Sequence, residues 1–372
     1  MNYEKNYRKV ISHQQGGIGA EFFRLFLRGI SVGYSGVVRL RNSLYSKGFF
    51  RTHIVSAAVI SIGNITVGGT GKTPLVIWLY KYLQKKQINC AILTRGYKTD
   101  DKGRATSYER RANAIDEPGI LAENCPHAKV IVNPDRVEGA VEAIKKYDAG
   151  ILIMDDGFQH RRLARDLDIV TIDATQPFGY DKIFPAGLLR EPVASLKRVD
   201  AVVITRCDQI SERQLTELEQ KLRAINPKML ITKSIHAPVS IKTTDGKQIS
   251  LEQLKGRKIF AFCGIGNPNA FLSTIEGLGG EIVGSEIFDD HHHYTNDCLA
   301  DIYKQAEHLK ADLVLTTQKD WTKIISNLKS QISYSKLIQL FAYLEIEIKF
   351  LAGEDKLTSL IENTLASKIS IK

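Results

Sequence analysis

Residues 61–79 read SIGNITVGGTGKTPLVIWL, in which three glycines stand close to a lysine and a threonine. The preceding run, 57–64 (AAVISIGN), is β-branched and apolar like a buried strand. The following run, 74–83 (PLVIWLYKYL), has helical apolar spacing, and its proline is tolerated in a first turn. A strand, a glycine-rich loop and a helix in this order predict a loop that binds phosphate through backbone N–H groups and the positive end of the helix.

The loop departs from the usual phosphate-loop consensus at one position. That consensus has Gly, four residues and Gly-Lys-Ser/Thr, whereas the first position here is Thr66. By the mechanism of such loops, Lys72 reaches the β- and γ-phosphates and Thr73 ligates Mg²⁺. An ordinary glycine-rich turn is the alternative, and the flanking pattern disfavours it. The predicted nucleotide-binding residues are Thr66, Val67, Gly68, Gly69, Thr70, Gly71, Lys72 and Thr73.

Length and composition limit the possible classes of protein. A chain of 372 residues suggests two domains, and 43% hydrophobic with 25% charged residues is a globular composition. The five cysteines form no CxxC pair, which disfavours a disulfide framework or a cysteine zinc site and favours a reducing compartment. We expect neither a membrane-spanning helix nor a cleaved secretory signal.

The positive charge is concentrated near the N-terminus. The net charge is +10, and residues 1–53 hold nine basic against two acidic side chains. Within 20–30 (AEFFRLFLRGI), a helical wheel places Glu21, Arg24 and Arg28 in a narrow polar wedge and apolar side chains elsewhere. This pattern is typical of a helix in a membrane interface, with the wedge meeting anionic headgroups. A helix packed on the protein's own core is the alternative, and no recognisable module indicates nucleic acid.

Apolar runs alternate with helical patterns through the middle of the chain. Residues 90–97 (CAILTRGY), 129–136 (KVIVNPDR), 167–173 (LDIVTID) and 200–208 (DAVVITRCD) are predicted strands. The run 150–160 (GILIMDDGFQH) is a buried strand that ends in Asp155 and Asp156. The alternation predicts a doubly wound, mostly parallel α/β sheet with ligands at the carboxyl ends of its strands.

The paired aspartates have the form of a Walker B element. Carboxylates at the end of a strand beside the phosphate-loop strand would hold Mg²⁺ directly or through water. A surface turn is the alternative, because Asp-Asp-Gly is also good turn chemistry. Asp155 and Asp156, together with Thr73, are therefore the predicted magnesium residues.

Two further segments give weaker signals. Residues 204–208 (ITRCD) partly match the element with which GTPases read guanine, but Phe158 stands where a GTPase needs glycine after its Walker B strand. In 288–295 (FDDHHHYT), three consecutive histidines are poorly arranged to ligate one metal ion. A histidine beside Asp290 suits proton transfer better, with a solvated loop as the alternative.

Around residue 231 the pattern changes. Residues 239–251 (VSIKTTDGKQISL) alternate about Asp245-Gly246, which predicts a hairpin. We predict a basic, membrane-associating segment over 1–53 and a P-loop domain over 54–230. A hairpin linker over 231–251 and a smaller C-terminal α/β domain over 252–372 complete the expected organisation.

Several motifs together resemble one family. In chain order they are VVRLRNSLYSKG (37–48), SIGNITVGGTGKTP (61–74), LTRGY (93–97), DEP (116–118), DDGFQHRRLARDLDIV (155–170), FPAGLLREP (184–192), GIGNP (264–268), DHHHYT (290–295) and TTQKD (316–320). The chain thereby resembles the tetraacyldisaccharide 4'-kinases, the lipid A 4'-kinases of Gram-negative bacteria. In that family the phosphate loop has Ser or Thr at the position of Thr66.

The resemblance implies transfer of the ATP γ-phosphate to the 4'-hydroxyl of a tetraacylated glucosamine disaccharide 1-phosphate, at the cytoplasmic face of the inner membrane. It assigns ATP to Lys72 and Thr73, Mg²⁺ as the metal, and a base dyad to Asp116 and His291. No nucleic acid or obligate protein partner is implied. The implied acceptor site comprises Arg95, Gln159, His160, Arg190 and Glu191.

Two other classes share part of the pattern. A partition-type P-loop switch would explain the amphipathic segment, but its signature lysine is replaced by Val67. A GTPase metal-insertion factor would explain Asp208 and the histidines, but it requires the missing glycine at Phe158. Neither explains Asp116 together with 155–160 (DDGFQH).

Overall fold

The computed structural model describes residues 3–95, 117–290, 292–330 and 340–369. The chain divides into two compact units. The larger comprises Asn6–Asn113, Leu121–His236 and Ile348–Lys372, and the smaller comprises Met1–Lys5, Ala114–Ile120 and Ala237–Glu347. The predicted base residues Asp116 and His291 lie outside the described residues.

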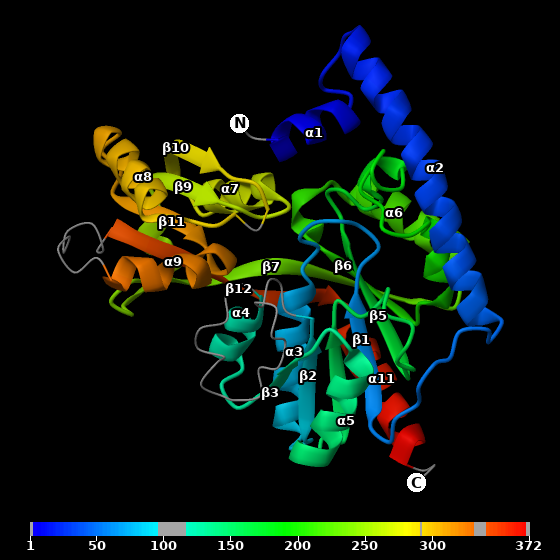
Figure 1. The fold of residues 1–372 in the computed structure, drawn as a ribbon. Coiled ribbons are helices and arrows are strands. Elements are labelled where there is room, and N and C mark those ends of the chain that lie inside the picture. The colour runs from blue at the N-terminus through cyan, green and yellow to red at the C-terminus, as the bar shows by residue number, and fades with distance from the viewer. Residues whose placement is uncertain (1–2, 96–116, 291, 331–339, 370–372) are drawn as a thin grey trace. The chain divides into compact units, whose positions relative to one another are not determined.

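A parallel sheet forms the centre of the larger unit (Figure 1). Its strand order is β7-β6-β5-β1-β4-β2-β3, and the pairs between these neighbours are parallel, as the alternating pattern predicts. Five of the strands are buried along their whole length, which explains their continuous apolar runs. The bounds are β1 Ala58–Gly63, β2 Cys90–Thr94, β3 Lys129–Val132, β4 Ile151–Asp155, β5 Leu167–Asp173, β6 Ala201–Thr205 and β7 Leu230–Thr243.

Helices connect these strands and pack on the sheet. Helix α3 (Lys72–Lys85) contacts β1, β2 and β4, whereas α5 (Arg136–Tyr147) contacts β2 and β3. Asp135 caps α5 by accepting hydrogen bonds from the backbone N–H groups of Val137 and Glu138. Helices α4 Glu117–Asn124 and α6 Glu212–Ile225 also have residues in this unit, and its short 3₁₀ turns include η2 Gly179–Asp181, η3 Val193–Arg198 and η4 Cys207–Gln209.

The end of the chain also belongs to the larger unit. In α11 (Glu354–Ile369), Leu357 and Ile361 are fully buried, and Glu362 pairs with Lys86 at 2.7 Å. The sequence-based expectation of one C-terminal domain over 252–372 therefore differs from the structure. The apolar face of this last helix packs in the larger unit. The periodicity of its sequence predicts an apolar face but does not specify which unit that face packs against.

The smaller unit has its own sheet and aromatic core. Its strand order is β10-β9-β11-β12-β7, with β10, β9, β11 and β12 paired in parallel. Buried Phe260, Phe262, Tyr294, Trp321 and Phe341 pack together in its core. Its elements are β9 Lys258–Cys263, β10 Glu281–Ile287, β11 Leu313–Thr317, β12 Phe341–Ala352, α7 Pro268–Gly277, α8 Asn296–His308, α9 Gln318–Ser330 and η5 Leu251–Leu254.

The predicted hairpin about Asp245-Gly246 is present. Strand β8 (Gln248–Ile249) pairs antiparallel with β7, with Ile241 opposite Ile249. Strand β7 nevertheless begins earlier, at Leu230, and its first residues pair with β6. The expected linker over 231–251 is therefore largely a sheet strand, because its apolar alternation allows pairing along its length.

The N-terminal helices are α1 (Tyr3–Ile11) and α2 (Ile18–Ser46). Helix α2 buries one narrow face, formed by Arg24, Leu27, Ser31 and Val38. The opposite face is apolar and exposed: its large residues include Ile18, Phe22, Leu25, Phe26, Val32, Val37 and Leu40.

The expected polar wedge of this helix is corrected at Arg24. Its side chain is buried, and its guanidinium donates to the carbonyl oxygens of Val10 (3.1 Å) and Gln15 (2.9 Å) and pairs with Glu21. Arg28 is exposed. Helical periodicity placed both arginines on one side, but carbonyl acceptors in the segment that precedes α2 draw Arg24 inward.

Candidate active site

The glycine-rich loop connects β1 to α3 as the sequence predicts. Gly68 and Gly71 have φ angles of 117° and 89°, in the region that side chains rarely adopt. Gly71 is the N-cap of α3, so Lys72 is the first residue of the helix, where backbone N–H groups lack partners within the helix. The loop therefore has the geometry of an anion site, with a buried lysine at the helix start.

Side chains from neighbouring strands fix the conformation of the loop. The Thr70 hydroxyl accepts a hydrogen bond from Asn64 Nδ2 at 3.0 Å and lies 2.7 Å from Thr171 Oγ1. The Thr205 hydroxyl donates to the Thr70 carbonyl at 3.0 Å. Thr66 forms a bridge with Leu189, so the residue that replaces the first consensus glycine is held by a distant segment. Thr171 and Thr205 carry no local signal in the sequence, so their contacts with the loop were not predicted.

The aspartate pair lies beside the loop. Strand β4 pairs with β1, and Asp155 is opposite Ile62. The Lys72 ammonium is 3.3 Å from the Asp156 carboxylate, and Arg190 Nη1 donates to both oxygens of Asp156, at 3.0 and 2.9 Å. Although burial alone would raise the pKa of Asp156, Lys72 and Arg190 lower it well below its usual range. Asp156 is therefore held ionised.

Residues after the aspartates are fixed against β1. A Cβ on Gly63 would lie 2.7 Å from the backbone nitrogen of Phe158, so only glycine permits this close approach. Gln159 Nε2 donates to the Asn64 carbonyl at 2.7 Å. Burial, with Arg136 nearby, lowers the pKa of His160. The half-buried His160 is thus favoured in its neutral form.

The segment 183–191 connects the loop with α2. Arg190 N donates to the Ile65 carbonyl and Val67 N to the Leu188 carbonyl, both at 2.7 Å. On the other side, the Ser31 hydroxyl of α2 donates to the Ile183 carbonyl, also at 2.7 Å. Segment 183–191 is therefore bonded to the phosphate loop through main-chain hydrogen bonds and to the exposed apolar helix through the Ser31 hydroxyl.

Glu191 is fully buried in a polar cluster. Its carboxylate accepts hydrogen bonds from Asn42 Nδ2 at 2.8 Å and Arg41 Nη2 at 3.2 Å, both on α2. Arg198 Nη1 lies 3.0 Å from Oε2 of the same carboxylate. These contacts give Glu191 a role in anchoring α2. This role could not be predicted from the sequence, because Arg41 and Asn42 precede Glu191 by 150 and 149 residues.

Two other sequence-derived sites can be placed. Arg95 is exposed at the end of β2. Arg206, within the partial guanine element, turns inward to pair with Asp173 at 2.5 Å. This segment therefore presents a buried ion pair at the end of β6.

In the smaller unit, three motifs meet beside the histidine segment. Lys319 Nζ pairs with Asp290 at 3.0 Å, and the Asp320 carboxylate accepts a hydrogen bond from Gly264 N at 3.0 Å. His292 stacks on Phe288, and burial lowers its pKa. The loop around Asp290 is thus anchored by residues of 264–268 (GIGNP) and 316–320 (TTQKD).

The donor set beside the loop fits magnesium chemistry. Asp155 is a buried carboxylate at the end of the strand next to β1, Asp156 is ionised, and Thr73 lies in the first turn of α3. Carboxylate and hydroxyl oxygens are the ligands that Mg²⁺ prefers. Within the described ranges, no group of three His, Cys, Asp or Glu side chains is arranged to hold a metal ion by itself.

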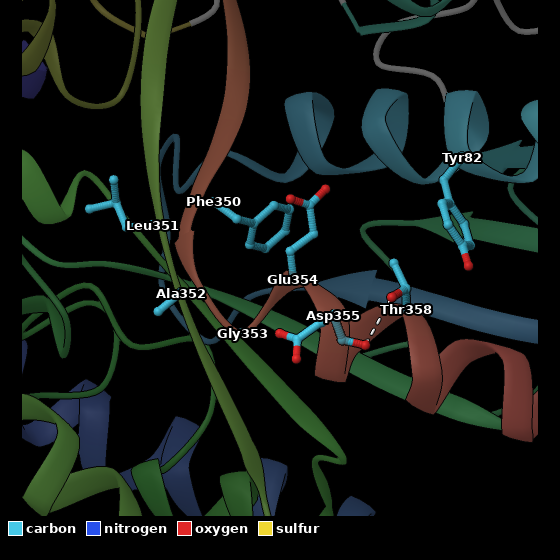
Figure 2. A pocket seen from close by; sticks show the side chains of 8 residues that line it. All are labelled: Tyr82, Phe350, Leu351, Ala352, Gly353, Glu354, Asp355 and Thr358. Atoms are coloured by element: carbon cyan, nitrogen blue, oxygen red, sulfur yellow. Dashed lines mark hydrogen bonds between the residues drawn. The ribbon is translucent and has the colours of Figure 1, made fainter.

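A separate open pocket of about 590 Å³ lies in the larger unit (Figure 2). Its walls come from Tyr82 on α3, the end of β12 and the first turn of α11, where Thr358 Oγ1 donates to the Asp355 carbonyl. None of the predicted site residues lines it. In the part of the chain that the structure describes, no helix has the length and hydropathy of a membrane-spanning segment.

Comparison with known proteins gives a consistent result. The family model described as Tetraacyldisaccharide-1-P 4'-kinase matches residues 23–366. The tetraacyldisaccharide 4'-kinase of Chlorobaculum parvum is 34% identical over 92% of this chain and 95% of its own length. That of Halothermothrix orenii is 37% identical over 78% and 80%, respectively.

The fold has a solved counterpart. The crystal structure of the "apo" form of LpxK from Aquifex aeolicus, in complex with ATP, matches with a TM-score of 0.67 and 29% identity, covering 92% of this chain and 99% of that one. The likeness confirms the predicted α/β fold of the P-loop type. With the family match over most of its length, the chain belongs to the tetraacyldisaccharide-1-P 4'-kinase family.

Proposed function

We propose that this chain transfers the γ-phosphate of ATP to the 4'-hydroxyl of a tetraacylated glucosamine disaccharide 1-phosphate, at the cytoplasmic face of a bacterial inner membrane. The observation that carries the proposal is the convergence of two distant segments on the phosphate loop. Asp156 and Arg190 form an ion pair there, and Asp156 also pairs with Lys72. Family membership supplies the reaction and the class of substrate.

In this proposal, the loop from Thr66 to Thr73 binds the phosphates of ATP. Backbone N–H groups at the start of α3 contact the phosphate oxygens, and Lys72 stabilises the negative charge that develops on the transferred phosphoryl group. Asp156 holds Lys72 at 3.3 Å before nucleotide binds. Its anionic charge keeps the buried lysine side chain oriented.

Thr73, Asp155 and Asp156 would hold Mg²⁺. The ion would neutralise phosphate charge during transfer. The chain's own contribution is to keep two carboxylates at the end of β4, beside the β1 strand that leads into the loop. Replacing Asp155 with Asn should raise the Mg²⁺ concentration needed for half-maximal rate, and an unchanged dependence would contradict this assignment.

The acceptor site would use the five residues that the family pattern indicates. We propose that Arg95, His160 and Arg190 meet the polar headgroup, since cationic and neutral donors suit phosphate and hydroxyl groups. Gln159 and Glu191 would shape the site through their contacts with Asn64 and with α2. Asp116 and His291 would deprotonate the 4'-hydroxyl, a poor nucleophile at neutral pH.

Helix α2 would deliver the enzyme to its lipid. Phe22 and Phe26 are 70% and 63% exposed, and exposed basic residues, including Arg28 and Arg39, accompany this face. An apolar face with basic neighbours suits an anionic membrane interface. Segment 183–191 joins this helix to the phosphate loop, so a lipid headgroup held at the interface would lie on the same framework as the nucleotide.

The decisive experiment incubates purified protein with γ-labelled ATP and the disaccharide 1-phosphate in mixed micelles. Labelled lipid, dependent on Mg²⁺ and absent with Lys72→Ala, would support the proposal. A disaccharide that already carries a 4'-phosphate serves as the matched substrate control and should remain unlabelled. Label in water-soluble products alone would overturn the lipid-kinase proposal.

A further inference from the structure

A histidine that the proposed mechanism does not use packs directly on the phosphate loop. His236 lies on β7 within the larger unit, and its ring faces Gly71, the N-cap of α3. A Cβ added to Gly71 would overlap the imidazole, lying only 2.9 Å from its Cε1 and 3.2 Å from Thr205 Cγ2. The glycine is therefore required twice, for its positive φ and for the close approach of His236.

The buried ring nitrogen lacks a partner. His236 Nε2 is shielded from solvent and has no hydrogen-bond partner among the described residues. A buried polar atom without a partner destabilises the folded state. By contrast, Ser234, two residues earlier on the same strand, donates to the Ile204 carbonyl at 3.0 Å. An unpaired nitrogen beside a ligand-binding loop indicates that its partner arrives with the ligand.

The surroundings set the protonation of the ring. Burial and the Arg206 guanidinium lower the pKa of His236 well below its ordinary value. A neutral imidazole can carry its proton on Nε2 and donate a hydrogen bond to an anion. It does so without adding a buried positive charge beside Arg206. Phosphate oxygens are the acceptors expected at the N-terminus of α3.

We infer that His236 is a nucleotide-binding residue, whose Nε2–H donates a hydrogen bond to a phosphate oxygen of the nucleotide held by the Gly71 loop. This inference rests on the proposed ATP site. It adds a residue from β7, about 165 positions from the loop, that no phosphate-loop pattern includes. The same bond gives the unpaired nitrogen a partner. Nucleotide binding is therefore favoured, because it relieves the cost of burying that nitrogen unpaired in the free protein.

The test compares two variants, His236→Gln and His236→Met, whose new side chains are similar in length. Gln keeps a donor near the position of Nε2, whereas Met keeps only the bulk. Dissociation constants for ATP, ADP and adenosine are measured by calorimetry on the full chain. We expect Met to weaken ATP and ADP binding about tenfold relative to Gln, with adenosine unaffected. The melting temperature of the free Met variant should equal or exceed that of Gln.

Ser234→Ala is the matched control, because it removes a satisfied hydrogen bond on the same strand. It should lower the melting temperature and leave ATP affinity unchanged. Equal ATP affinities for Gln and Met would overturn the role of His236. A loss that also extends to adenosine would overturn the phosphate contact.

Failure of the proposed function gives a different result. If the wild-type chain itself does not bind ATP, the ATP site is wrong. If the wild type binds ATP and Lys72→Ala does not, while Gln and Met remain equal, only the inference about His236 fails.

Discussion

At the scale of single residues, the centre of the site is a charge cluster of one carboxylate and two cations. Asp156 receives Lys72 on one oxygen and Arg190 on both, and this pairing outweighs the burial that would otherwise raise its pKa. Breaking such a pair leaves charge without compensation in a partly buried place. The cluster should therefore respond both to mutation and to pH.

Lys72→Ala should abolish phosphate transfer, because it removes the cation placed on the developing negative charge. The lysine is at the first helical position of α3 and the sheet behind it is apolar, so the fold should persist. Turnover is measured with labelled ATP, and circular dichroism checks the fold. A folded Lys72→Ala protein with near-normal turnover would refute the nucleotide site.

Thermal unfolding of Asp156→Asn between pH 7 and pH 3 tests whether the ion pairs of Asp156 with Lys72 and Arg190 stabilise the fold. The pKa of Asp156 is lower in the folded state than the unfolded value of about 3.9. Its ionised form therefore stabilises the fold above that value, and the contribution is lost as pH falls through the folded pKa.

The wild type should melt above Asp156→Asn at pH 7, and the gap should narrow below about pH 4. Asp301→Asn, on an exposed ion pair with Lys304, is the control and should show a much smaller gap. A difference for Asp156→Asn that does not change with pH would contradict the ion-pair origin.

At the scale of elements, α2 is an amphipathic helix that buries polar side chains and exposes most of its large apolar ones, the reverse of a helix packed in a core. Its buried strip includes an arginine and a serine that bond to backbone carbonyls, while its broad aromatic face is exposed. A contiguous exposed apolar surface of this kind marks an interaction site. Segment 183–191 ties that surface to the phosphate loop, so α2 should affect use of the lipid more than use of ATP.

Phe22→Ser combined with Phe26→Ser should shift the protein from anionic vesicles to the soluble fraction. The apparent KM for the lipid should rise more than that for ATP, because apolar burial in the interface is lost. Flotation with vesicles and steady-state kinetics measure the two effects. Arg28→Glu should act in the same direction through charge.

Ser31→Ala is the control on the buried face of α2, since its hydroxyl bonds to the Ile183 carbonyl. It should leave vesicle binding intact. Aggregation or unfolding of the double Phe variant would instead identify its aromatic face as a packing surface.

At the scale of the whole molecule, two units with separate cores are joined through strands that run in both. Residues of β7 and β12 fall on either side of the division, so the chain passes from one unit to the other through sheet strands. Residues that act in one reaction can therefore come from widely separated parts of the chain, as Asp156 and Arg190 already do within the larger unit.

Asp116 and His291, the two proposed base residues, are also far apart in the chain. If they act as one base, Asp116→Ala and His291→Ala should each lower kcat by about 10²-fold or more, with little change in the KM for ATP. The double variant should be barely worse than either single one, because residues that act as a unit lose their joint effect once. Single-turnover kinetics with the lipid substrate measure the rates.

His292→Ala and His293→Ala are the neighbouring controls. Fully multiplicative losses in the double variant would separate the two proposed partners. A normal rate in His291→Ala, with the defect appearing in His292→Ala or His293→Ala, would assign the base to another imidazole.

The sequence by itself determined several features that depend on near neighbours in the chain. Strand, glycine loop and helix around Lys72, the aspartates ending β4 and the turn at Asp245-Gly246 all follow from spacing and residue type. The alternation of apolar runs likewise predicted the parallel sheet. Backbone geometry and periodicity are local properties, so they can be derived from the order of residues alone.

Tertiary structure decided which distant groups meet. It turned Arg24 inward, buried Glu191 against α2, and brought Thr205 and His236 to the phosphate loop. It also assigned α11 to the larger unit. These outcomes depend on matching carbonyls, charges and apolar faces more than 100 residues apart in most cases, and a local pattern specifies that a side chain needs a partner without specifying which one it finds.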